Sequence, residues 1–193
     1  VVDGVPLGSS WNQLDAGSAT FGSLSYSDGA GAAGVTLHRL GSATNSGTGT
    51  SIKIPQDCTP LLQDYWLHSG GARIGIGIEG LAAGPYDVWV VGHYAAGGDP
   101  AVKLFTGDVS TFDIATADMT GAETITDNQS TWEEGVNYVK LSIGLGGGED
   151  LIMVGDGTNI TLLNGMQVAV PEPASLTLVL AGAGLLTRRR FRK

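Results

Sequence analysis

Two pairs of adjacent carboxylates could serve as acid and base in catalysis: Glu133-Glu134 and Glu149-Asp150. Hydrolysis of a glycosidic bond requires two carboxyl groups that face each other across a cleft. Neighbouring side chains on a strand or loop usually point apart, so both pairs are predicted to lie on the solvated surface. A small secreted hydrolase is therefore the least favoured function for this chain. We expect no catalytic residues and no enzymatic activity.

Metal ligation has little support in the spacing of the histidines and carboxylates. No two histidines are four residues apart, as zinc ligands on one face of a helix would be. The histidines are His38, His68 and His93. Oxygen ligands of Asp150, Asp156 and Asn159, in and beside the Gly-rich stretch 144–157, could hold calcium loosely. The spacing fits no EF-hand, and turn formation explains it better, so we expect no cofactor and no metal site.

Tryptophans are the other candidates for ligand recognition. A pyranose ring stacks through its CH face on an exposed aromatic ring, with polar groups nearby. Trp89 lies in a strongly apolar run and is predicted to be in the core. Three others fall in turn or helix contexts and are candidates for ligand stacking, although packing is the favoured interpretation. They are Trp11, Trp66 and Trp132.

Residues 170–193 carry the strongest pattern in the chain. The Pro171-Glu172-Pro173 segment comes first, and its prolines continue neither a strand nor a helix. An uncharged apolar stretch follows, which is short for a bilayer span but must be helical in hydrocarbon. The residues predicted to form this membrane segment are Ala174, Leu176, Leu178, Val179, Leu180, Leu185 and Leu186. The basic stop, predicted to remain cytoplasmic, consists of Arg188, Arg189, Arg190, Arg192 and Lys193.

These three features, in this order, resemble the PEP-CTERM sorting signal of exopolysaccharide-producing Gram-negative bacteria. The resemblance covers residues 171–193. It implies recognition by an exosortase, a membrane cysteine protease-like transpeptidase, and cleavage that releases the domain or attaches it to surface material. The alternative, a buried carboxyl-terminal core helix, conflicts with the five cations that follow the apolar run.

Composition and charge favour a β-rich protein and exclude a nucleic-acid partner. Gly accounts for 31 of 193 residues and charged residues for only 15%, which disfavours helices and suits short strands with tight turns. Residues 1–170 hold five basic and 18 acidic residues, a net charge of −13 (5 − 18), which repels phosphates. The single cysteine, Cys58, excludes an internal disulfide. The sequence starts at Val1 without a basic-then-apolar leader, so export is inferred from the tail.

Short alternating apolar segments predict about ten strands. The clearest are 73–79, where three isoleucines share one face, and 86–94, whose continuous apolar run predicts a central strand. Residues 41–50 are predicted to form a polar loop, 80–85 a turn, and 60–68 a helix with Pro60 in its first turn. The weaker strands are 20–26, 35–40, 51–54, 102–105, 111–115, 123–127, 137–143, 151–154 and 161–170.

The order of these elements resembles galactose-binding-like or malectin-like β-sandwiches. The residues that carry the resemblance are Ser10-Trp11-Asn12, the turn and strand 80–88, and the closing Leu162-Leu163-Asn164-Gly165-Met166-Gln167-Val168. The predicted fold class is all-β: a jelly-roll-like β-sandwich domain over 1–169, followed by a sorting and membrane tail over 170–193 with a hydrophobic helix.

The sequence is compatible with three functions. The leading hypothesis is an exported protein of the cell membrane or cell surface, or one secreted after tail processing. Its partners would be exosortase and the membrane, through the tail, and extracellular polysaccharide, through the domain. A structural or adhesive surface protein without a specific ligand is the second hypothesis, and the small hydrolase is the third. The fold alone does not separate them.

Overall fold

The structure is a computed structural model that describes residues 18–25, 30–41, 45–48, 64–69, 71–92, 100–126, 133–157 and 160–170. All the regular secondary structure within these ranges consists of β-strands, and each strand pairs with its neighbours in the antiparallel direction. The all-β prediction is therefore confirmed for the described part of the chain. The predicted strand 51–54 and the hydrophobic helix of the tail lie outside it.

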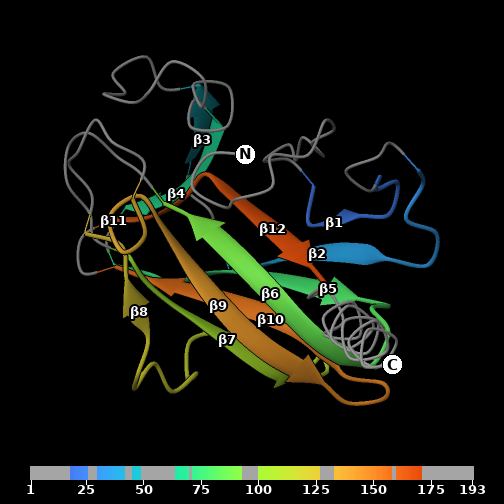
Figure 1. Cartoon of the computed structure of the whole chain (residues 1–193). Helices are drawn as coiled ribbons and strands as arrows, with labels where there is room; N and C mark the ends of the chain where they lie inside the picture. Colours follow the sequence, from blue (N-terminus) through green and yellow to red (C-terminus); the bar gives the residue numbers. More distant parts are fainter. Residues whose placement is uncertain are drawn as a thin grey trace, which may run out of the picture.

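A six-stranded sheet forms one layer of the molecule (Figure 1). Its order is β1 (Thr20–Phe21), β2 (Thr36–Leu40), β5 (Ile74–Glu79), β10 (Asp150–Asp156), β7 (Ala101–Gly107) and β8 (Glu123–Thr124). The second layer is a three-stranded sheet in the order β12 (Gly165–Ala169), β6 (Gly84–Val91) and β9 (Tyr138–Leu145). A further three-stranded sheet contains β11 (Ile160–Leu163), β4 (Asp64–Ser69) and β3 (Asn45–Thr48).

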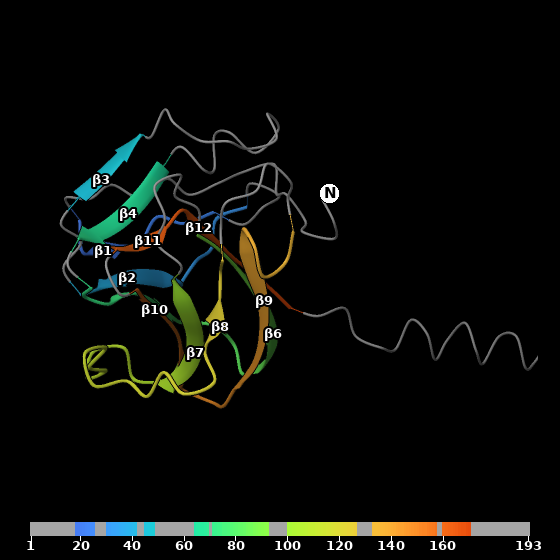
Figure 2. The ribbon, with the colours of Figure 1, turned by 90° about the vertical axis from the view of Figure 1, so that its left-hand side faces the viewer.

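The main core lies between the six-stranded sheet and the β12–β6–β9 sheet, which Figure 2 shows from the side. Alternate residues of the central strands point into it, as expected from the period of two. From β5 these are Ile74, Ile76 and Ile78, and from β6 they are Val88 and Val90. All five are buried, so the two segments that the sequence predicted most clearly form the centre of the sandwich.

A second, smaller core covers the opposite face of the six-stranded sheet. Ile114, Ile152 and Val154 are buried there, with Phe105 and Phe112 packed against them. Gly75 and Gly77 of β5 leave the space that this layer fills, because a Cβ at Gly77 would collide with the side chain of Val109. The covering segment is the connection between β7 and β8, residues 108–122, which appears as a yellow-green coil in Figure 2.

The predicted strand 111–115 is wrong, because residues 108–122 form successive turns. Asp108, Asp113 and Asp118 recur every five residues, and each accepts a hydrogen bond from the backbone N–H two residues later, at 2.8, 3.0 and 2.9 Å. Such side chain–backbone bonds favour turns over a strand ladder. Two cations hold the coil on the sheet, since Arg73 and Lys103 donate to its backbone carbonyls.

Three other predictions need correction. The helix over 60–68 is wrong where it is described, because Asp64–Ser69 is strand β4, paired with β3 and β11. The loop over 41–50 contains strand β3. The segment 161–170 is two strands, β11 and β12, which separate at Asn164 and join different sheets. In each case pairing with residues distant in sequence overrides local propensity.

Candidate functional site

A group of polar side chains surrounds a tryptophan on the outer face of the β12–β6–β9 sheet. Because Val88 and Val90 of β6 point into the core, Asp87 and Trp89 lie on the opposite face. Strand register sets Trp89 beside Lys140 of β9 and Gln167 of β12, and Asp87 beside Ser142. We name these residues the outer-face cluster: Asp87, Trp89, Lys140, Ser142 and Gln167.

Asp87 is the hydrogen-bonding centre of the outer-face cluster. Its Oδ2 lies 2.8 Å from Nζ of Lys140, and its Oδ1 accepts a hydrogen bond of 2.6 Å from Oγ of Ser142. The hydrogen bond from Lys140, followed by that from Ser142, lowers the pKa of Asp87 below its usual value. The carboxylate is therefore ionised at neutral pH and fixed in orientation, with remaining lone pairs that can accept further hydrogen bonds.

Trp89 is buried, but not in the core where the sequence placed it. The residue is only 8% exposed, and it is absent from the main core because it lies on the outer face of β6. Nζ of Lys140 lies 5.1 Å from the centroid of its ring, within cation–π range. The Lys140 side chain, itself 40% exposed, therefore covers part of the indole.

Gln167 lies on the other side of Trp89. Its Oε1 atom is buried and has no hydrogen-bond partner. A buried acceptor without a donor is uncommon and costly, so this oxygen would gain a hydrogen bond if the atoms that cover it moved and a hydroxyl group reached it. The sequence alone did not reveal the outer-face cluster, because the relevant signal is the cross-strand register of three segments far apart in the chain.

The predicted stacking tryptophans are not brought together in the part of the chain that the structure describes. Trp11 and Trp132 lie outside the described residues. Trp66 belongs to strand β4 rather than to a helix, and only its backbone is described. Their role in ligand stacking stays a prediction.

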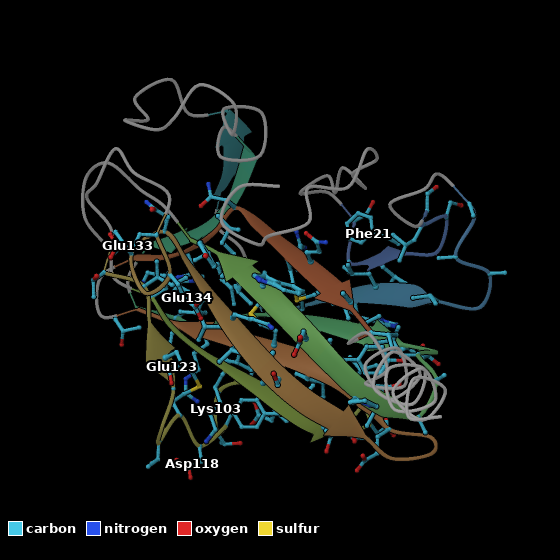
Figure 3. All side chains as sticks on the ribbon, in the orientation of Figure 1. Phe21, Lys103, Asp118, Glu123, Glu133 and Glu134 are labelled. Atoms are coloured by element: carbon cyan, nitrogen blue, oxygen red, sulfur yellow. The ribbon has the colours of Figure 1, made fainter. Side chains whose placement is uncertain are left out.

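The paired carboxylates lie on two separate turns. Glu133 and Glu134 are both exposed beside the start of β9 (Figure 3). Glu149 accepts hydrogen bonds from the Gly146 N–H at 2.7 Å and the Thr106 hydroxyl at 3.3 Å. Asp150 accepts one from the Val109 N–H at 2.9 Å. Glu149 and Asp150 therefore brace the turns at the end of the six-stranded sheet.

The two aspartates considered for calcium are at opposite ends of β10. Asp150 begins the strand, and Asp156 ends it, where Asp156 Oδ2 lies 2.8 Å from Nε of Arg73. At about 3.3 Å per residue the two positions are too far apart to ligate one ion. Among the described residues, no group of three His, Cys, Asp or Glu side chains is placed to hold a metal ion.

The last strand leads directly into the tail. Ala169, the final residue of β12, is paired with Asp87, and the next residue, Val170, is 64% exposed. Within the described ranges, no helix has the length and apolar character needed to span a membrane. The tail residues named in the sequence analysis lie outside these ranges.

Comparison with known proteins identifies this tail. Residues 169–193 match the PEP-CTERM protein-sorting motif, which indicates an exported protein sorted to the cell surface. The match confirms the predicted sorting signal and location, and it implies processing by an exosortase. None of the curated proteins matches the chain.

Two solved structures illustrate a distant similarity to this chain. One is a family GH115 4-O-methyl-alpha-glucuronidase, BtGH115A, with 13% identity over 56% of this chain and a TM-score of 0.36. Another is a calcium-binding mutant of Bacteroides uniformis beta-glucuronidase 2, with 14% identity over 77% of this chain and a TM-score of 0.42. The chain spans only 14% and 15% of their lengths.

Proposed function

We propose that this surface-sorted protein binds extracellular polysaccharide, without enzymatic activity, through the outer-face cluster. The observation that carries the proposal is the unpaired, buried Oε1 of Gln167 beside the indole of Trp89. Adjacent strands are about 4.8 Å apart, so an acceptor, an aromatic ring and a cation lie side by side across the sheet. A sugar residue presents hydroxyl donors and an apolar CH face within similar dimensions.

Each member of the outer-face cluster has a defined role in this proposal. The Gln167 carbonyl and the Asp87 carboxylate accept hydrogen bonds from sugar hydroxyls, and Lys140 donates to ring or hydroxyl oxygens. Ser142 keeps the Asp87 carboxylate oriented through its hydrogen bond of 2.6 Å. Lys140 has a flexible stem, so it can leave the Trp89 ring and make room for the CH face of a sugar.

The test compares two aspartates that have the same local chemistry. Asp87 and Asp108 each accept a hydrogen bond of 2.6 Å from a serine hydroxyl, but Asp108 lies in the 108–122 coil on the other sheet. Co-sedimentation of the full chain, in mild detergent, with insoluble polysaccharides and with the producing cells' own exopolysaccharide measures binding. Asp87→Ala is expected to weaken binding about tenfold, equivalent to about 1.4 kcal/mol, and Asp108→Ala to leave it unchanged. Equal binding by both variants would remove the outer-face cluster from the proposal.

A structural or adhesive surface protein without a ligand is the alternative function. The exposure of Trp89, only 8%, favours it, because a preformed stacking platform would present more of the ring. Absence of saturable binding to every polysaccharide tested would select this alternative.

A further inference from the structure

The sorting motif is joined to the folded domain without a spacer. The matched residues begin at Ala169, which is also the last residue of β12 and is paired with Asp87. Only Val170 separates this strand from Pro171. Two residues span at most about 7 Å, at ~3.6 Å per residue, even when they are fully extended. An enzyme that recognises the motif therefore meets the folded domain at the same time.

The surface beside this junction is formed by the turns at one end of the sandwich. Register places Gly84 and Pro85 of β6 beside Leu145 and Gly144 of β9, so the turns 80–83 and 146–148 flank the same end. The Tyr86 hydroxyl donates a hydrogen bond of 2.8 Å to the Ala82 carbonyl and holds the first turn against β6. We name this surface the exit end: residues 80–85, 144–148 and 169–170.

The exit end can be covered by a partner without burial of an unpaired charge. None of its residues is charged, although residues 1–170 carry a net charge of −13 (5 − 18). The nearby carboxylates are already engaged. Glu79 lies 3.0 Å from His38, Glu149 accepts the Gly146 N–H, and Asp150 accepts the Val109 N–H. Burial of a carboxylate that already accepts a hydrogen bond costs less than burial of one without a donor.

We propose that the exit end docks onto the exosortase, so that the enzyme contacts the folded end of the domain together with the Pro-Glu-Pro motif. The partner is the enzyme rather than lipid because the matched sorting motif starts at the last residue of β12, so an enzyme that binds the motif is brought beside the exit end. The proposal does not depend on polysaccharide binding, since the outer-face cluster and the exit end share no residue.

A pair of matched alanine variants tests the docking surface. Ala82 is exposed at the exit end. Ala115 is also exposed but lies in the 108–122 coil, where its carbonyl accepts a hydrogen bond from Arg73 at the opposite end of β5. The full chain is expressed in a host that supplies the exosortase, and loss of the tail is followed by mass over time. Ala82→Glu is expected to slow tail loss about fivefold or more, equivalent to about 1 kcal/mol. Ala82→Ser and Ala115→Glu are expected to process at the original rate.

A flexible spacer and a second variant make the outcome decisive. Insertion of about eight Gly and Ser residues between Val170 and Pro171, spanning roughly 16 Å, should make processing insensitive to Ala82→Glu. Gly147→Glu should reproduce the defect if Ala82→Glu fails to fold, because a Cβ at Gly147 meets no atom within 4 Å. An unchanged rate in the folded glutamate variant overturns the proposal, as does a defect that persists with the spacer. Binding of the purified full chain to anionic phospholipid vesicles is measured in parallel. If the glutamate variant weakens vesicle binding as much as it slows tail loss, lipid is the partner and the proposal is overturned.

Discussion

Arg73 forms an ion pair with Asp156 at the end of β10, with its Nε 2.8 Å from the Asp156 carboxylate. The same guanidinium also binds the 108–122 coil on the outside of the six-stranded sheet. Its Nη1 donates to the carbonyls of Ile114, Ala115 and Ala117 at 2.9, 3.1 and 2.7 Å. One guanidinium therefore supplies the hydrogen-bond donors that these carbonyls would otherwise need from water. Lys103 makes a similar but more exposed pair of bonds to the carbonyls of Asp118 and Thr120, and Figure 3 labels Lys103 and Asp118.

Arg73→Met should destabilise the domain by about 2 kcal/mol, because charge-assisted hydrogen bonds contribute about 1.5–3 kcal/mol when a buried partner is left unsatisfied. Lys103→Met should cost less, about 1 kcal/mol, because its bonds are exposed to solvent. The free energy of unfolding from urea titration measures both. A larger loss for Lys103→Met would contradict the role assigned to Arg73.

Gly80→Ala should be among the most damaging single-methyl additions to the chain. Gly80 has φ of +87°, which L-residues other than glycine rarely adopt, and an added Cβ would collide with the backbone oxygen of Gly34. We expect a loss of about 2 kcal/mol or more. Gly144→Ala is the matched control, because its Cβ would meet no atom within 4 Å. Equal unfolding midpoints in urea for the two variants would show that the turn after β5 is not constrained as described.

The stability that Asp87 provides should disappear in acid. Its folded-state pKa is lowered from 3.8 by the hydrogen bonds from Lys140 and Ser142, so its contribution is complete above that value. As the pH falls through the lowered folded-state pKa, the carboxylate is protonated in both states and the contribution is lost. The difference in unfolding free energy between the original chain and Asp87→Asn should therefore stay constant down to about pH 5 and shrink below it, as the pH falls toward the lowered folded-state pKa. A difference that grows toward low pH would contradict this assignment.

Removal of the Lys140 side chain should uncover the indole of Trp89. Acrylamide quenching of tryptophan fluorescence should increase in Lys140→Ala, with emission shifted to the red, because the ammonium group 5.1 Å above the ring is gone. Lys103→Ala is the matched control, since Lys103 lies 5.3 Å from the ring of Phe105 rather than from a tryptophan. Unaltered quenching in Lys140→Ala would show that other residues bury the indole.

Local pattern in the sequence predicted the centre of the fold and missed its periphery. The strands β5 and β6 were recognisable because their apolar runs fill the core directly. The coil at 108–122 contains enough apolar residues to resemble a strand, but its aspartates bond to their own backbone. Strand β4 was mistaken for a helix because Pro60 supplied a helix-start signal, whereas pairing with β3 and β11 decides its structure.

The candidate site was less predictable than the sorting tail for a similar physical reason. A sorting motif is contiguous, so its order of prolines, apolar residues and arginines is visible in the sequence. The outer-face cluster draws Asp87 from β6, Lys140 from β9 and Gln167 from β12, and only the strand register brings them together. The segments that carry Trp11 and Trp132 lie outside the described residues, so stacking on those rings stays a prediction.

The carboxyl-terminal motif is proposed to direct a β-sandwich to the cell surface. Fractionation of cells that express the chain with or without residues 171–193 is the most direct test. The full chain and the shortened chain, each tagged within the 108–122 coil, are expressed in a host that contains an exosortase. We expect the full chain to be recovered with the membrane or surface fraction and the shortened chain to be recovered in the soluble or secreted fraction. The same distribution for both chains would contradict it.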